Sequence, residues 1–140
     1  MQHRGVGRCR ARDDAGAAVV DFVMISVLLV VLLLGVLQVA VYFYARNVTA
    51  AAAADAARYA AAREIDPRDG GPRASRLIHE GLDDADAAAI TCTGRAARDR
   101  RSGLAVTTVH CIGHIRLLFL PLHLPLTIDV TASVLREGSP

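Results

Sequence analysis

The sequence contains no tryptophan and no lysine, and aromatic residues make up only 4% of it. Three cysteines are too few for a disulfide-rich scaffold. Neither sign of charge dominates, since 16 arginines stand against 14 acidic residues. This balance excludes a nucleic-acid binder that works by bulk charge, and with 53% hydrophobic residues it also excludes a disordered charged tail. A length of 140 residues leaves room for one small domain or less.

The apolar residues are concentrated in one uncharged run from Phe22 to Tyr44. As a helix this run extends about 34 Å, enough to cross a hydrocarbon core of about 30 Å. A secretory signal peptide is one alternative, but its apolar region is usually only about 7–15 residues long. A buried helix of a soluble protein is another, although nothing else in the sequence could cover it. We therefore predict a transmembrane span over 22–44 in a single-pass cell-membrane protein.

The distribution of arginines predicts the orientation of this span. Four arginines precede it within residues 1–12, whereas only Arg46 and Arg58 follow it closely. Because positively charged flanks stay on the cytoplasmic side, we expect a cytoplasmic N-terminus and an extracytoplasmic C-terminal part.

The junction before the span reads GAAVVDF from Gly16 to Phe22. Taken alone, Asp21 could simply mark the cytoplasmic end of the span and face the lipid headgroups. The whole pattern, however, resembles the processing site of type IV prepilin-like proteins. The stretch 16–62 resembles the TadE-like family, pseudopilin-like proteins of tight-adherence (Flp) pilus loci, in which a glutamate usually stands where this chain has Asp21. Further matching positions in this stretch are Gly35, Gln38, Tyr42, Arg46 and the run Arg58-Tyr59-Ala60-Ala61.

The resemblance implies that a prepilin-type peptidase removes residues 1–16, a basic leader, by cutting after Gly16 and leaving Ala17 as the new N-terminus. Asp21, beside Phe22, would neutralise the new Ala17 ammonium. The two groups are four residues apart on a helix, and the carboxylate could equally pair with the amine of an adjacent subunit. The implied function is a minor pseudopilin or assembly component of a tight-adherence pilus or type IV-like secretion machine. Its partners would be the lipid bilayer, the peptidase and other pilin-like subunits or pilus assembly proteins.

Gly35, Gln38 and Tyr42 follow one another at helical spacings of three and four, continued by Ala45 and Thr49. Small and amide-bearing residues on one stripe allow membrane helices to approach and to form hydrogen bonds, so this stripe is a candidate helix-packing face. Alternatively, Gln38 is tolerated alone and the tyrosines are interfacial anchors.

The helix should continue through alanine-rich sequence, so that a long helix covers 17–64 and ends at the turn-rich segment 65–72. Residues 65–140 are expected to form a small exported α+β domain, which makes the fold class membrane α+β with three antiparallel strands. We predict a helix over 72–82, strands over 87–93, 104–115 and 126–135, and an exposed loop over 95–103. The Pro-interrupted segment 117–125 is expected to be a loop.

Cys92 and Cys111 fall in two of the predicted strands outside the membrane, where disulfides persist. A disulfide is favoured if the two strands are antiparallel neighbours, and two buried thiols are the alternative. Cys9 lies in the predicted leader.

No catalytic residues can be assigned, because the sequence shows no nucleophile–base set, phosphate loop or CxxC motif. His110 and His114 would lie about 13 Å apart on one strand, too far for one metal ion. We therefore expect no enzyme activity, metal, cofactor, nucleic acid or small-molecule substrate. The alternative function is an uncleaved single-pass signal-anchor protein with a small extracytoplasmic partner-binding domain, and a processed secreted protein is a more distant third.

Overall fold

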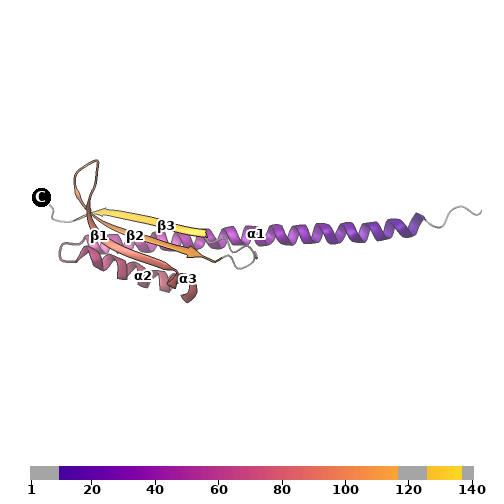
Figure 1. Ribbon diagram of the computed structural model, residues 1–140, viewed down its shortest axis with the longest axis horizontal. Helices are drawn as coiled ribbons and strands as arrows, with labels where there is room; N and C mark the ends of the chain where they lie inside the picture. Colours follow the sequence, from indigo (N-terminus) through magenta and orange to yellow (C-terminus); the bar gives the residue numbers. More distant parts are fainter. Residues whose placement is uncertain (1–9, 117–125, 137–140) are drawn as a thin grey trace, which may run out of the picture. The chain divides into compact units, whose positions relative to one another are not determined.

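The computed structural model describes the backbone of residues 10–116 and 126–136, and the side chains from residue 16 onward. The predicted loop 117–125 and residues 1–9 of the predicted leader lie outside the described residues. The chain divides into an N-terminal unit, Met1–Leu37, and a C-terminal unit, Gln38–Pro140. The elements are α1 (Arg10–Ala61), η1 (Pro67–Asp69), α2 (Gly70–Gly81), α3 (Asp84–Ala88), β1 (Ile90–Arg98), β2 (Ala105–Ile115) and β3 (Leu126–Leu135), and Figure 1 labels all of them except η1.

The described residues of the N-terminal unit form the first part of α1. Its large apolar side chains are exposed on every side of the helix, for example Phe22, Met24 and Leu33. The hydroxyl of Ser26 in this unit donates to the Phe22 carbonyl at 2.7 Å and is thereby satisfied within the helix. Among the described residues, α1 is the helix that is long and apolar enough to cross a membrane, judged by length and composition. It has the character of a membrane anchor or a signal segment.

The C-terminal unit contains a three-stranded antiparallel sheet in the order β1-β2-β3. The sequence prediction of a long apolar helix followed by such a sheet is therefore confirmed. The register places Cys92 directly opposite Cys111, and the two are joined by the predicted disulfide. Cys111 is fully buried, so the bond lies on the face of the sheet that packs into the core.

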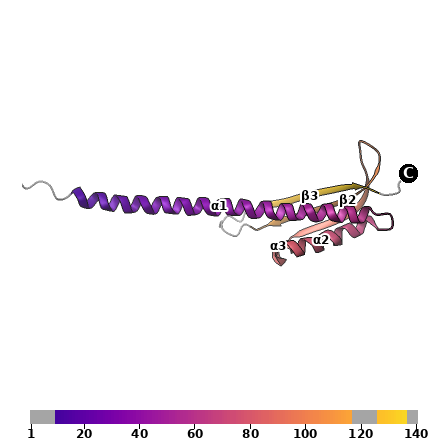
Figure 2. The same cartoon turned by 180° about the vertical axis from the view of Figure 1, so that it is seen from behind.

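The C-terminal part of α1 packs against this sheet through a face composed almost entirely of alanine (Figure 2). Because alanine adds little bulk, the helix backbone and the sheet approach closely, and the Thr107 hydroxyl donates to the Ala60 carbonyl at 3.2 Å. Thr49, also fully buried, donates within the helix to the Ala45 carbonyl at 2.9 Å. The buried alanines of α1 are Ala45, Ala52, Ala53, Ala56, Ala57, Ala60 and Ala61.

The segment η1–α2 packs closely against β1, as α1 does against the sheet. A side chain at Gly71 would meet the Cys92 carbonyl at 2.8 Å, and one at Gly94 would overlap the Pro67 carbonyl. Since those obstacles are backbone atoms, they cannot move aside as a flexible side chain could. The Gly-Gly pair therefore belongs to the helix and its packing, which is why α2 begins at Gly70 instead of at residue 72 as predicted.

The bounds of α3, β1 and α1 also differ from the sequence prediction. Residues 84–88, partly assigned to a strand, form α3 because the Asp83 carboxylate accepts from the Asp86 amide at 2.9 Å and caps the helix. Desolvation, reinforced by Asp83, raises the pKa of Asp86. Because residues 84–88 are helical, β1 begins only at Ile90. It continues to Arg98, into the segment predicted as a loop. Helix α1 begins at Arg10 and ends at Ala61, earlier at both ends than the expected 17–64.

The turn between β1 and β2 is short and built around Asp99. Its carboxylate accepts from the Ser102 hydroxyl at 2.6 Å and from the Ser102 amide at 2.9 Å. These hydrogen bonds stabilise the charged form and hold the pKa of Asp99 below its ordinary value. Gly103 completes the turn with a φ of +69°, a conformation that favours glycine.

Candidate processing and assembly site

The predicted cleavage site, Gly16 and Ala17, lies inside α1, since the helix begins six residues earlier at Arg10. Both residues are exposed. A side chain added at Gly16 would meet no atom within 4 Å. The packing of the described residues therefore gives no reason for glycine at this position, and glycine weakens a helix by about 1 kcal/mol relative to alanine.

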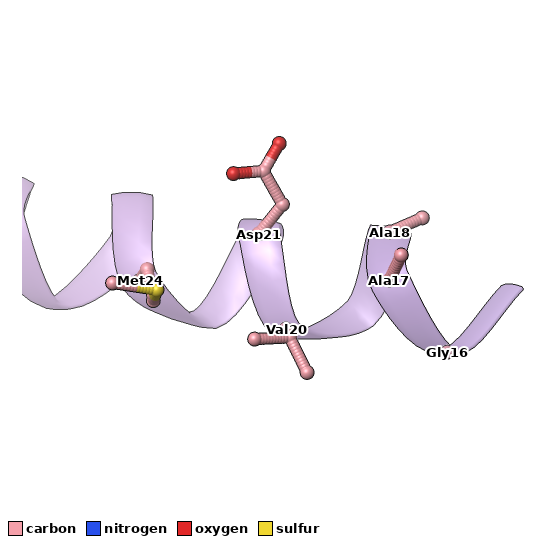
Figure 3. A pocket seen from close by; sticks show the side chains of 6 residues that line it. All are labelled: Gly16, Ala17, Ala18, Val20, Asp21 and Met24. Atoms are coloured by element: carbon pink, nitrogen blue, oxygen red, sulfur yellow. The ribbon is translucent and has the colours of Figure 1, made fainter. Parts of the chain in front are cut away.

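Asp21 stands four residues after Ala17, so the two positions are neighbours on the helix surface. Figure 3 shows the Asp21 carboxylate projecting from the side opposite to Val20. Asp21 forms no ion pair with the residues that the structure describes, and its neighbour Phe22 is 72% exposed. The shallow hollow at this place is lined by one helix alone, so it is an open surface and not an enclosed site. Its lining residues are Gly16, Ala17, Ala18, Val20, Asp21 and Met24.

Gly35, the first of the three predicted helix-packing residues, is as free of neighbouring atoms as Gly16. No atom lies within 4 Å of the position that its side chain would occupy. The helix surface is therefore notched at Gly35, and nothing in the described part of the chain fills the notch. A close approach by another helix remains a prediction for this position.

The other two helix-packing candidates are covered within the C-terminal unit. Gln38 is buried in the C-terminal unit. Tyr42 is half-buried against the core, and its hydroxyl donates to the Thr127 carbonyl at the start of β3, at 3.4 Å. The predicted continuation of the stripe, Ala45 and Thr49, is fully buried as well. A role for Gln38 and Tyr42 in contacts with another subunit stays a prediction.

Sequence reasoning gave no separate role to Phe43, and it named Tyr44 only as a membrane anchor. Both side chains are more than half exposed, yet the Tyr44 hydroxyl donates to the Gly81 carbonyl at the end of α2, at 3.0 Å. The signal in the sequence was the clustering of Tyr42, Phe43 and Tyr44, which are half of the chain's three tyrosines and three phenylalanines.

The histidines of β2 lie on the exposed face of the sheet. His110 Nε2 is 2.9 Å from an oxygen of Asp129, and His114 Nδ1 is 3.4 Å from the Thr127 hydroxyl. Among the described residues, no group of three His, Cys, Asp or Glu side chains is placed to hold a metal ion.

Residues 16–58, the segment that holds the candidate cleavage site, Asp21, Gly35, Gln38 and Tyr42, match the family described as TadE-like protein. No curated protein and no solved structure matches the chain. The resemblance predicted from the sequence is therefore confirmed over these residues, and the first part of this chain is a TadE-like segment.

Proposed function

We propose that this protein is a single-pass, pilin-like component of a tight-adherence pilus assembly machine, processed after Gly16 and assembled through α1. The TadE-like match over 16–58 implies a protein associated with the assembly of such a pilus. No catalytic role is part of the proposal. The domains are then a leader over 1–16, the long helix with its membrane span, and an exported domain from residue 65 onward.

The observation that carries this proposal is the exposed carboxylate of Asp21 in an otherwise apolar helical segment. Between Ala17 and Leu37 it is the only charged residue, and no described residue pairs with it. A carboxylate near the membrane core is costly unless it faces the interface or a positive partner. Cleavage after Gly16 supplies such a partner, because water adds across the peptide bond and leaves an ammonium on Ala17.

The helix must open locally before a peptidase can reach the bond between Gly16 and Ala17. A helical peptide bond is shielded by its turn, and the segment around it would have to become extended. Glycine at position 16 lowers the cost of this opening by about 1 kcal/mol relative to alanine. A residue without a packing role in its own chain thus has a function in recognition by another protein.

The test is the intact mass of the protein from cells with and without a prepilin-type peptidase. We expect loss of residues 1–16 only when the peptidase is present, and no loss in the Gly16→Leu variant. Gly35→Leu is the matched control, because it changes the other unpacked glycine of α1 and should leave processing intact. An unprocessed wild-type chain, in cells where another prepilin is cut, would support the uncleaved signal anchor instead.

A second test addresses Asp21. We expect Asp21→Asn to be processed normally but to lose co-purification with pilin-like subunits, whereas Asp21→Glu, which keeps the charge, should retain it. Equal co-purification by the Asn variant would remove charge neutralisation from the mechanism.

A further inference from the structure

The part of α1 between Gln38 and Tyr44 has two different sides. One side is occupied by the chain's own domain, through Gln38 and Tyr42. The other side carries the interfacial collar, which we define as Val39, Val41, Phe43 and Tyr44. These four side chains are 55%, 44%, 52% and 58% exposed, although all are large and apolar or aromatic.

The collar ends abruptly. After the buried Ala45 come Arg46 and Asn47, which are polar and exposed, and further along the exposed side of α1 come Asp55 and Arg58. Helical rise from Val39 to Tyr44 is about 8 Å. That distance matches the interfacial layer of a bilayer, about 5–8 Å on each side of the hydrocarbon core. Residues 17–37, which precede the collar, would themselves cross about 30 Å as a helix.

Two hydrogen bonds, one from the collar and one from the neighbouring Tyr42, join this part of α1 to the domain. The Tyr44 hydroxyl donates to the Gly81 carbonyl of α2, and the Tyr42 hydroxyl donates to the Thr127 carbonyl of β3. Tyrosine rings favour the membrane interface because one end is apolar and the other polar. Here the polar end bonds to backbone carbonyls of α2 and β3. The helix surface that lipid would cover is therefore held against these two elements.

We propose that the interfacial collar lies in the headgroup layer of the bilayer, so that lipid covers it and the C-terminal unit rests on the membrane surface. The proposal rests on the membrane span of the proposed function. Lipid is the favoured occupant because, along the sequence, the collar follows directly on the exposed apolar residues that end at Leu37. The span then occupies residues 17–37, and the predicted limit at Tyr44 is the outer edge of the interface.

The absence of tryptophan allows a direct test by fluorescence. Phe43→Trp and Val39→Trp each place a single tryptophan in the collar, Val27→Trp places one at the centre of the span, and Ile112→Trp places one on the exposed face of β2. Each full-length variant is reconstituted at low density in phosphatidylcholine vesicles. The lipids carry bromine, a quencher, either near the glycerol end or near the methyl end of the acyl chains. Formation of the Cys92–Cys111 disulfide, read by mass, shows that each variant is folded.

We expect the two collar tryptophans to be quenched several-fold more by shallow than by deep bromine. The Val27→Trp reporter should show the reverse order, and Ile112→Trp should be quenched by neither lipid. If the collar reporters are unquenched, or are quenched most by deep bromine, while Val27→Trp responds as expected, the collar proposal is wrong and the span stands. Emission shifted to the blue without quenching would mean that protein covers the collar, which also overturns the proposal. If Val27→Trp itself is unquenched, the membrane span of the proposed function fails.

Discussion

The glycines of the two units differ in what surrounds them. In the C-terminal unit, five glycines have a position for a side chain that is already occupied by another atom at less than 3 Å. In the N-terminal unit, Gly16 and Gly35 have no atom within 4 Å of that position. The five occupied positions are Gly70, Gly71, Gly81, Gly94 and Gly113. At these five positions glycine is thus explained by the chain's own packing, and at Gly103 by the positive φ, whereas at Gly16 and Gly35 the packing of the described residues gives no reason for it.

Polar groups divide in the same way. Thr49 and Thr107 of the C-terminal unit are buried with their hydroxyls bonded to backbone carbonyls. Asp21 of the N-terminal unit is exposed in an apolar stretch and forms no ion pair with a described residue. The two buried hydroxyls are thus satisfied within the C-terminal unit, whereas the Asp21 carboxylate of the N-terminal unit is left exposed.

Removal of the disulfide should have the largest effect on stability. The Cys92→Ala, Cys111→Ala double variant should lose about 3 kcal/mol of unfolding free energy, because the bond closes a long loop across 19 residues. The loss should be confined to the C-terminal unit and should leave the apolar part of α1 helical. Denaturant unfolding of the full chain in detergent, followed by circular dichroism, measures it. Reductant should lower the stability of the wild type to that of the variant, and no difference between them would contradict the prediction.

Gly94→Ala should come next, with a loss of about 2 kcal/mol, because the added methyl group would overlap backbone atoms of the η1–α2 segment. Gly35→Ala adds the same methyl group where no atom is near, and should leave the stability of the C-terminal unit unchanged. Thermal unfolding of both variants measures the difference. Equal losses would break the contrast between the two units.

Arg73→Ala should cost about 0.5–1 kcal/mol. The Arg73 guanidinium lies 3.2 Å from Asp55 and 5.2 Å from the centre of the Tyr59 ring, but the ion pair is exposed and therefore weak. Arg76→Ala, an exposed arginine on the same helix, is the control and should be neutral. If Arg76→Ala costs as much, helix propensity and not these contacts explains the loss.

Ser102→Ala should have the smallest effect, and it should depend on pH. The Ser102 hydroxyl keeps the pKa of Asp99 below its ordinary value, so its removal should raise that pKa. Because the folded-state pKa is the lower one, the stabilisation is present above the unfolded pKa of about 3.9 and is lost as pH falls through the folded pKa. The two proteins should therefore differ at neutral pH and converge in acid, as carboxyl NMR titration and unfolding at both pH values would show. A difference that persists in strong acid would assign the effect to the turn itself.

Much of the fold could be predicted from local pattern. The alternation of β-branched residues placed β3 at its observed bounds, and the cysteines were correctly paired once two neighbouring strands contained them. The start of β1 was wrong because the helix of α3 is set by one cap at Asp83, a stronger local signal than the β-propensity that follows. Its end was wrong because pairing with β2 holds Arg95 to Arg98 in the strand despite their polarity.

The candidate site was only partly predictable, for a different reason. A stripe of small and polar residues indicates that something packs against a helix, but not which molecule does so. Tyr42 meets the chain's own sheet, and that contact depends on a residue more than 80 positions away, Thr127. No local pattern contains this information.

The disulfide has a consequence for the order of events during maturation. Cys111 is fully buried, whereas Cys92 is only partly buried, so an oxidant can form a mixed disulfide with Cys92 in the packed domain. The Cys111 thiolate opposite it then displaces the oxidant and completes the bond without being reached from solvent. If the C-terminal unit is exported as proposed, its last covalent bond forms after translocation, and the compartment where the chain is oxidised is also the place where the domain becomes fully stable.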